Sequence, residues 1–307
     1  MEKTDVPVLN RRAMLGLAAA GLAGSLASCA AETKTSGAAA SSAPTRRRFD
    51  AKVVLITGAT SGIGRAAALQ FAAEGAKVSF CGRREKLGSE LESAIKAGGG
   101  QAQYVRADVR NEADIKNFVD RTVEKFGRLD VAFNNAGITL EKRLHEYGSQ
   151  EWDDVINTNL RGVFLAMKYE IPYMLRTGGG NIVVTSSSNA LATTEHRSAY
   201  SASKRGLIGL VQSAAFDYAQ HGIRVNALIP GTTDTELVRR AAGMEHAPDA
   251  VWEEMARIWA KSHVPGLQRM ATPEEIAAFA LTLASDDLPF ITAAQMVIDG
   301  GKTAHAG

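Results

Sequence analysis

A tyrosine and a lysine stand four residues apart at Tyr200 and Lys204. In a helix this spacing places both side chains on one face, so the ammonium group can act on the phenol. A free tyrosine has a pKa of about 10, and acid-base work near neutrality needs a shift of roughly 3 units, or about 4 kcal/mol. A neighbouring cation acts in the required direction. Such a pair is common on helices, so its meaning depends on the residues around it.

Two other polar residues have types and positions that fit acid-base chemistry. Ser187 stands thirteen residues before Tyr200, at the end of a β-rich run at residues 181–186, with serines on both sides. Asn159 lies in the segment Asn157-Thr158-Asn159-Leu160-Arg161-Gly162. Serines at the end of a strand also act as ordinary capping residues, so the spacing to Tyr200 is what singles out Ser187.

A glycine cluster follows the β-rich run at residues 53–57. Gly58, Gly62 and Gly64 have the spacing Gly-x-x-x-Gly-x-Gly, and a helical pattern comes next. Glycine lets the backbone turn sharply and lets a pyrophosphate approach the amide groups at a helix N-terminus, where the helix dipole favours an anion. The order of strand, turn and helix therefore predicts a phosphate site, although a tight βα turn without a ligand has the same spacing.

Seven β-rich runs alternate with helical patterns along the chain. This alternation predicts an α/β, doubly wound Rossmann fold, with a seven-stranded parallel sheet and helices on both faces. Residues 49–307 have the size of one such domain. The predicted strands are residues 53–57, 77–81, 103–106, 131–134, 181–186, 224–229 and 295–298.

Together these motifs resemble the short-chain dehydrogenase/reductase family, in its type with about 250 residues and a Tyr-x-x-x-Lys pair, from about residue 52 to 301. The resemblance implies an enzyme that moves a hydride between NADP(H) and a small-molecule carbonyl or alcohol substrate. It implies that Tyr200 is the general acid and base, that Ser187 bonds to the substrate oxygen, and that Lys204 lowers the pKa of Tyr200 and holds the ribose. Asn159 is implied to anchor a proton-relay water. A homotetramer or homodimer is also implied.

The resemblance extends to the segments that contact the cofactor. It implies that Asp108 meets the adenine, that residues 134–137 support the glycine turn, and that residues 230–235 bind the nicotinamide carboxamide. The full set of expected cofactor contacts is Gly58, Ser61, Gly62, Ile63, Gly64, Arg83, Asp108, Val109, Asn135, Ala136, Gly137, Tyr200, Lys204, Pro230, Gly231, Thr233 and Thr235.

The choice between NADP(H) and NAD(H) is expected at the end of the second strand. An acidic residue there bonds the ribose hydroxyls and repels a 2′-phosphate. This chain has Gly82 at that position, followed by Arg83, whose guanidinium suits a phosphate. NADP(H) is therefore favoured, and an NAD-dependent alcohol or sugar dehydrogenase is the alternative. A non-catalytic NADP-binding sensor or structural protein is the alternative from another class.

The first 48 residues have a different character. Paired arginines at positions 11 and 12 precede an apolar run at residues 13–28, which ends in Leu26-Ala27-Ser28-Cys29. This is the layout of a twin-arginine export signal at residues 1–29, and Cys29 lies in a possible lipobox. Residues 30–48 read as a disordered tether. The chain is thus expected to be exported, periplasmic or membrane-anchored through Cys29, with an uncleaved tail on a cytoplasmic enzyme as the alternative.

Composition excludes other classes of function. The chain has 35 Lys and Arg against 33 Asp and Glu, a net charge of +2, so it lacks the broad basic field that nucleic-acid binding needs. Its two cysteines, Cys29 and Cys81, belong to no cluster with metal-ligand spacing, so no metal site is expected.

Residues 236–268 read as a helical lid over the substrate, and their apolar bulk favours a hydrophobic or cyclic carbonyl compound.

Overall fold

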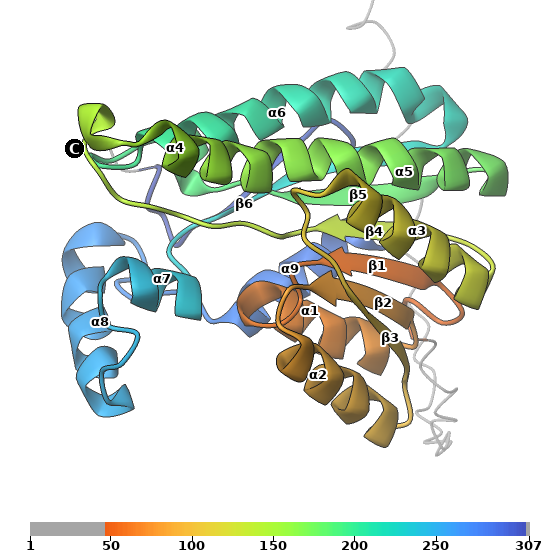
Figure 1. Cartoon of the computed structure of the whole chain (residues 1–307), viewed down its shortest axis with the longest axis horizontal. Helices are drawn as coiled ribbons and strands as arrows, with labels where there is room; N and C mark the ends of the chain where they lie inside the picture. The colour runs from red at the N-terminus through yellow and green to blue at the C-terminus, as the bar shows by residue number, and fades with distance from the viewer. Residues whose placement is uncertain (1–46, 305–307) are drawn as a thin grey trace, which may run out of the picture. The chain divides into compact units, whose positions relative to one another are not determined.

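A parallel sheet of seven strands forms the centre of the molecule in the computed structural model, which describes residues 47–304. The strands lie in the order β3-β2-β1-β4-β5-β6-β7, so the predicted doubly wound Rossmann fold is confirmed (Figure 1). Their bounds are β1 Val53–Thr57, β2 Lys77–Gly82, β3 Gln101–Arg106, β4 Val131–Asn134, β5 Gly180–Thr185, β6 Ile223–Pro230 and β7 Gln295–Ile298. Three strands match their predicted bounds and four differ by one or two residues at one or both ends.

Helices cover both faces of this sheet and extend beyond one edge. One face carries α1, α2 and α9, and the other carries α3, α4, α5 and α6 (Figure 1). The bounds are α1 Gly62–Ala73, α2 Glu85–Ala97, α3 Glu112–Phe126, α4 Ser149–Ile156, α5 Gly162–Thr177, α6 Ser198–Tyr218, α7 Glu236–Ala241, α8 Asp249–His263 and α9 Pro273–Ala284. Short 3-10 turns occupy Leu144–Glu146, Ser188–Ala190 and Ala219–His221, and a π-helical turn occupies Asn157–Arg161.

The strands are apolar on both faces because both faces are covered. In β1, Val54 and Ile56 pack into the core under α1 and α9, whereas Leu55 between them packs into the core under α3, α5 and α6. Successive side chains of a strand point to opposite faces, so a strand buried on both sides reads as a continuous apolar run. This explains why β1 has no polar residue before Thr57.

The strand order creates a crevice beside β1. The chain proceeds from β1 to β3 on one side and crosses back to β4 on the other side of β1. In open α/β sheets ligands bind at such a switch point, outside the carboxyl ends of the strands. Helices α7 and α8 lie beyond these ends, on the left of Figure 1, as the predicted lid requires.

Several expectations for the N-terminal part lie outside the described residues, namely the export signal, the lipid anchor at Cys29 and the tether as far as residue 46. Arg47 and Arg48, which the sequence analysis assigns to the tether, are placed against the domain. Arg48 donates a hydrogen bond to Glu74 at 3.0 Å, so this end of the tether contacts the folded part. Within residues 47–304, no helix has the length and hydrophobicity that a membrane span requires.

Candidate active site

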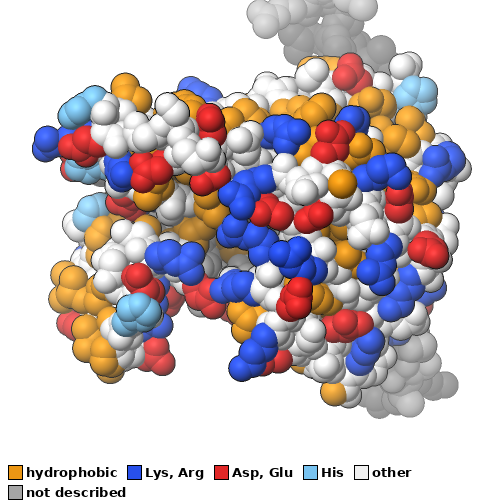
Figure 2. Space-filling model, viewed as in Figure 1, with side chains coloured by type: hydrophobic (Ala, Val, Ile, Leu, Met, Phe, Trp, Pro, Cys, Tyr) orange, Lys and Arg blue, Asp and Glu red, His pale blue; other side chains and the backbone are white. Residues whose placement is uncertain are grey.

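A cavity of about 550 Å³ opens at the carboxyl ends of β1, β2, β4, β5 and β6. Its volume is in the range of small-molecule sites. On this face of the molecule a hollow separates the lid from the body, and Lys and Arg side chains gather on its rim (Figure 2). All predicted site residues line the cavity except Gly64 and Asn159. Among residues 47–304 no cluster of potential metal ligands is present.

The glycine turn forms a cradle that larger residues cannot replace. Gly58 has φ +70°, and a Cβ there would lie 2.6 Å from the Cα of Ala136. Gly64 packs instead of lining the cavity, because a Cβ there would lie 2.4 Å from the carbonyl oxygen of Gly58. Ser61 is the N-cap of α1, and its side chain accepts no capping hydrogen bond within the described residues. The first turn of α1 therefore offers free amide groups to an anion, which fits a dinucleotide pyrophosphate.

The segment after β4 supports this turn through hydrogen bonds. The Thr57 hydroxyl accepts from the backbone N–H groups of Asn135 at 3.0 Å and Ala136 at 3.2 Å. The Asn135 side chain donates to the carbonyl oxygen of Gly58 at 3.2 Å. These bonds tie β4 to the end of β1, which is the contact that the family resemblance implies for residues 134–137.

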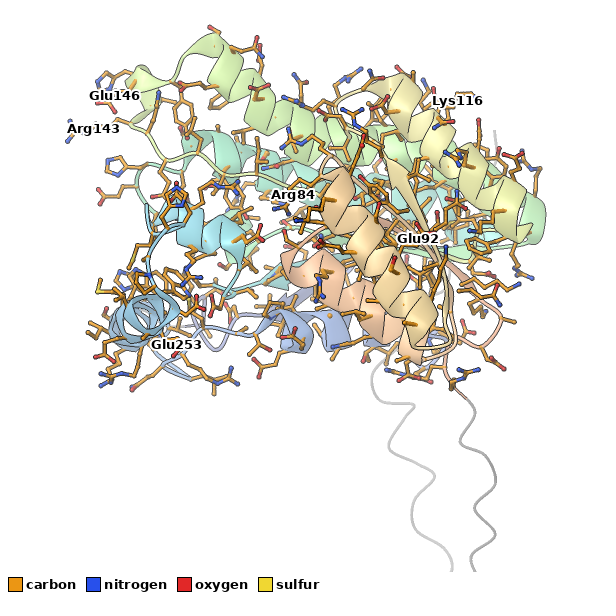
Figure 3. All side chains as sticks on the ribbon, turned by 60° about the horizontal axis from the view of Figure 1, so that its bottom comes forward. Arg84, Glu92, Lys116, Arg143, Glu146 and Glu253 are labelled. Carbon is orange, nitrogen blue, oxygen red and sulfur yellow. The ribbon has the colours of Figure 1, made fainter. Side chains whose placement is uncertain are left out.

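The end of β2 presents two arginines to the cavity. Arg83 is half-exposed and lies 4.0 Å from Asp108. Arg84 donates to the hydroxyls of Thr60 at 3.1 Å and Ser61 at 2.5 Å and pairs with Glu236 at 2.6 Å. Figure 3 shows Arg84 at the N-terminal end of α2. The two arginines therefore place positive charge on the part of the cavity wall that follows β2.

Gly82 also bears on the choice of cofactor. A Cβ at position 82 would lie 2.6 Å from the Cγ2 of Thr60, so an aspartate there does not fit without movement of Thr60. Asp108, which follows the neighbouring strand β3, accepts hydrogen bonds from the guanidinium of Arg110, which hold its pKa below the ordinary value. An aspartate at position 82, the residue type expected of an NAD site, would therefore have to displace the Thr60 side chain.

Tyr200, Ser187 and Lys204 meet in one corner of the cavity. Lys204 is buried, its Nζ lies 5.7 Å from the centre of the Tyr200 ring, and it donates to the carbonyl oxygen of Thr185 at 2.7 Å. Burial lowers the pKa of Lys204 to about 8. Burial also raises the pKa of Tyr200, and a hydrogen bond from Ser187 and the charge of Arg197 oppose that rise. The chain alone thus keeps the phenol protonated, whereas the sequence analysis expects a lowered pKa.

Asn159 lies behind this corner, in the π-helical turn between α4 and α5. Its side chain is buried and clasps the backbone of Ile138, accepting from the N–H at 2.8 Å and donating to the carbonyl oxygen at 2.9 Å. A second N–H of the amide donates to Ser203 at 3.0 Å. π-Helical turns are frequent at functional sites. Within the described residues the side-chain oxygen of Asn159 accepts one hydrogen bond, so its second lone pair is available to a water.

The lid closes the far wall of the cavity. Thr233 and Thr235 line the cavity, and Thr235 is the N-cap of α7, accepting from the backbone of Val238 at 3.4 Å. Trp252 of α8 is buried and donates to Asp234 at 2.8 Å, and it does not line the cavity. Of the predicted lid, α7 therefore forms the cavity wall, and α8 packs behind α7.

Sequence reasoning missed several residues that line the cavity. Arg84 is adjacent to the selected Arg83, so the paired arginines were the available signal. Glu236 and Arg240 lie within the predicted lid, residues 236–268, but no sequence signal singled them out, because their positions in the cavity depend on how α7 docks. The cavity wall that sequence reasoning did not assign comprises Thr60, Arg84, Ala107, Ile138, Thr139, Leu140, Glu141, Thr158, Thr185 and Ser186.

Comparison with known proteins gives consistent matches over the described domain. A family model described as enoyl-(acyl carrier protein) reductase matches residues 58–303. The chain is 43% identical over 257 residues to an A-factor type γ-butyrolactone 1′-reductase of Streptomyces virginiae, covering 82% of this chain and 95% of that protein. It is 39% identical over 268 residues to a 3β-hydroxysteroid dehydrogenase of Mediterraneibacter gnavus, covering 84% of this chain and 97% of that protein.

The fold also matches a solved oxidoreductase structure. The crystal structure of levodione reductase superposes with a TM-score of 0.78 at 35% sequence identity. The match covers 84% of this chain and all of that one. Sequence and fold therefore indicate the same group of proteins.

Proposed function

Because the chain belongs to the short-chain dehydrogenase/reductase family, it is an oxidoreductase that acts on alcohol or carbonyl groups, and we propose that it uses NADP(H) with Tyr200 as general acid and base. The observation that carries this proposal is the corner where Tyr200, Ser187 and buried Lys204 share one cavity with the glycine turn. The cofactor, when bound, supplies the hydride. Every other part of the chemistry falls to side chains of this chain.

In carbonyl reduction the protonated Tyr200 donates its proton to the substrate oxygen, and the Ser187 hydroxyl donates a hydrogen bond to the same atom. Lys204, with its pKa of about 8, is largely protonated at pH 7, so its charge stabilises the phenolate that forms. Asn159 fixes the backbone at Ile138, which lines the cavity. Since burial raises the pKa of Tyr200, the free enzyme is set for reduction near neutral pH, and alcohol oxidation increases at higher pH.

Three features support NADP(H) over NAD(H). Gly82 leaves no room for an acidic side chain beside Thr60, Arg83 lines the cavity with its guanidinium half-exposed, and Arg84 holds the glycine turn beside it. A 2′-phosphate carries about two negative charges and forms charge-assisted hydrogen bonds with guanidinium groups. We assign phosphate recognition to Arg83 and support of its binding site to Arg84.

The relatives support a secondary alcohol or ketone on a ring or a bulky framework. Their names include a steroid dehydrogenase and reductases of levodione and a γ-butyrolactone. The wall around Leu140 and Leu237 is partly apolar, as such substrates need.

The direct test is a spectrophotometric screen of the full chain with NADPH and then NADH, against cyclic ketones, steroids and aldehydes.

The screen is repeated with Tyr200→Phe, which keeps the ring and removes the proton. Turnover is expected to fall at least 100-fold, in the range of general acid-base catalysis, while NADPH still binds. Undiminished turnover in this variant would remove the mechanism. Tight NADPH binding by the unaltered chain without turnover of any compound in the panel would favour the non-catalytic alternative.

The cofactor preference is tested with Arg83→Asp. The preference for NADPH over NADH, measured as the ratio of kcat/KM values, is expected to fall by at least 10-fold, because a carboxylate repels the 2′-phosphate. Arg65→Asp, at an exposed position of α1 outside the cavity, makes the same charge change and serves as control. An unchanged preference in Arg83→Asp would refute the role of Arg83.

A further inference from the structure

Almost every charged side chain that lines the cavity already has a partner. Glu236 pairs with Arg84, Glu141 with Arg197, and Asp108 with Arg110 and Arg83, while Lys204 donates to a backbone carbonyl. Arg240 is the exception. Within residues 47–304 its guanidinium forms no ion pair and no hydrogen bond, although it lines the same cavity.

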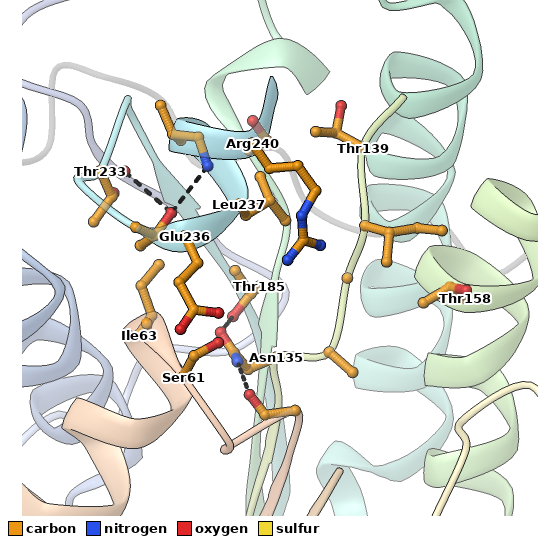
Figure 4. A pocket seen from close by; sticks show the side chains of 18 of the residues that line it. Ser61, Ile63, Asn135, Thr139, Thr158, Thr185, Thr233, Glu236, Leu237 and Arg240 are labelled. Atoms are coloured by element: carbon orange, nitrogen blue, oxygen red, sulfur yellow. Dashed lines mark hydrogen bonds between the residues drawn. The ribbon is translucent and has the colours of Figure 1, made fainter. Parts of the chain in front are cut away.

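The direction of this side chain is shown in Figure 4. Arg240 extends from α7 into the middle of the cavity, between Leu237 and the segment that carries Thr139. Its neighbour Arg239 has a structural role, since it pairs with Asp249 at 2.8 Å and lies over the Trp252 ring at 5.5 Å. Helix α7 therefore has one arginine that holds the lid and one that faces the ligand space.

The surroundings of Arg240 specify the kind of ligand group that it can bind. A guanidinium has five donors in a planar fork that matches a carboxylate. The cation of the catalytic corner, Lys204, already donates to the carbonyl oxygen of Thr185. Glu236, on the same helix, is held on the side of Ser61 by Arg84. No carboxylate of the described chain is therefore placed to neutralise Arg240.

A second observation separates Arg240 from the cofactor site. The groups suited to the cofactor phosphates are the first turn of α1 with Ser61, and Arg83 and Arg84 at the end of β2. Arg240 belongs to α7 of the lid and extends toward the Thr139 segment, so it comes from an element other than the glycine turn and the end of β2. We propose that Arg240 is a specificity-determining residue that binds a carboxylate group on the carbonyl substrate. The inference rests on the proposed function, since it places the substrate carbonyl at Tyr200.

The test uses a matched pair of ketones, 4-oxocyclohexanecarboxylate and its neutral carboxamide, with NADPH and the full chain. Arg240→Met keeps much of the side-chain length and removes the charge. Its kcat/KM for the carboxylate is expected to fall 10- to 100-fold and its kcat/KM for the carboxamide to stay within 3-fold. For the carboxylate, the kcat/KM of Arg240→Lys is expected to lie between those of Arg240→Met and the unaltered enzyme, because lysine keeps the charge without the fork.

Arg257→Met serves as the charge control, because Arg257 is exposed on α8 and lies outside the cavity. An equal ratio of carboxylate to carboxamide activity in Arg240→Met and the unaltered enzyme would overturn the inference. Equal losses for both ketones with a raised Kd for NADPH would also overturn it, since Arg240 would then hold the cofactor.

The failure of the proposed function gives a different result. In that case neither ketone is turned over, and calorimetry with the NADPH complex decides the inference separately. Binding of 4-oxocyclohexanecarboxylate that is lost in Arg240→Met supports it, and binding that is absent or unchanged in this variant overturns it.

Discussion

The catalytic corner and the lid are built on different principles, although they face each other across one cavity. In the corner the polar groups of Asn159 and Lys204 are buried and bonded to backbone atoms of Ile138 and Thr185. In the lid the ion pairs Arg84–Glu236 and Arg239–Asp249 join side chains of which at least one is largely exposed. Exposed pairs contribute about 0–1 kcal/mol each, whereas buried polar groups cannot lose a partner without a larger cost.

This difference separates two tasks. Acid-base chemistry needs reacting groups held in one geometry before the substrate arrives, and backbone anchors supply this geometry. Recognition of a substrate tolerates movement, and the weak surface pairs of the lid allow it. We therefore expect substitutions in the corner to change kcat or stability strongly, and substitutions of the lid pairs to change binding weakly.

The largest effect is expected from Lys204→Met, which removes the buried charge of the corner. Turnover should fall at least 100-fold because the Tyr200 phenolate loses its cation. The melting temperature should change little, because the loss of the hydrogen bond to Thr185 is offset by the removal of a buried charge that is costly at pH 7, as the lowered pKa of about 8 for Lys204 indicates. Steady-state kinetics and thermal unfolding check both parts. A variant that is inactive because it is destabilised would contradict this account of the corner.

A second buried ionisable group, Glu170, predicts an effect on stability. Glu170 is fully buried in α5, accepts a hydrogen bond from Asn134 at 2.9 Å, and has a pKa raised to about 8 by burial. Between pH 5 and 8 the unfolded chain loses this proton and the folded chain keeps it, so the free energy of unfolding falls as pH rises. The side chain of Glu170→Gln does not titrate. The free energy of unfolding of this variant should therefore exceed that of the unaltered chain by an amount that grows with pH, reaching about a few kcal/mol at pH 8.

The measurement is denaturant unfolding of both proteins at pH 5, 6.5 and 8. Glu253→Gln, on the exposed lid helix α8 (Figure 3), is the matched control and should follow the unaltered chain at each pH. A constant difference between Glu170→Gln and the unaltered chain across this range would show that Glu170 is ionised in the folded protein.

The smallest effect is expected in the lid. Glu236→Gln removes the partner of Arg84 and a negative charge that lies beside Ser61 in Figure 4. The Kd for NADPH should fall about 2- to 5-fold, and stability should change by at most about 0.5 kcal/mol, as for surface substitutions. Fluorescence titration with NADPH checks this. Asp249→Asn breaks the other lid pair away from the cavity and should leave the Kd unchanged, so equal shifts in both variants would point to general loosening.

The sequence was sufficient for the sheet and for most of the cavity floor. The strands were predicted within one or two residues, because a sheet covered on both faces needs continuous apolar runs. The glycine turn and the Tyr200–Lys204 pair could be placed because each depends on spacing over a few residues, whereas Asp108 was placed by the family resemblance. The pKa of Tyr200 could not be predicted, since it depends on burial by segments distant in sequence.

By itself the sequence determined which elements form, which turn can receive a phosphate, and which residues stand at the ends of the strands. Only the tertiary structure decided which arginine of α7 faces the ligand, that Arg84 reaches Glu236 across 152 positions, and that Asn159 clasps Ile138. The physical reason is the distance along the chain over which each effect acts. Backbone geometry and side-chain periodicity act over a few residues, whereas burial, charge pairing and the direction of an exposed side chain depend on contacts between distant segments.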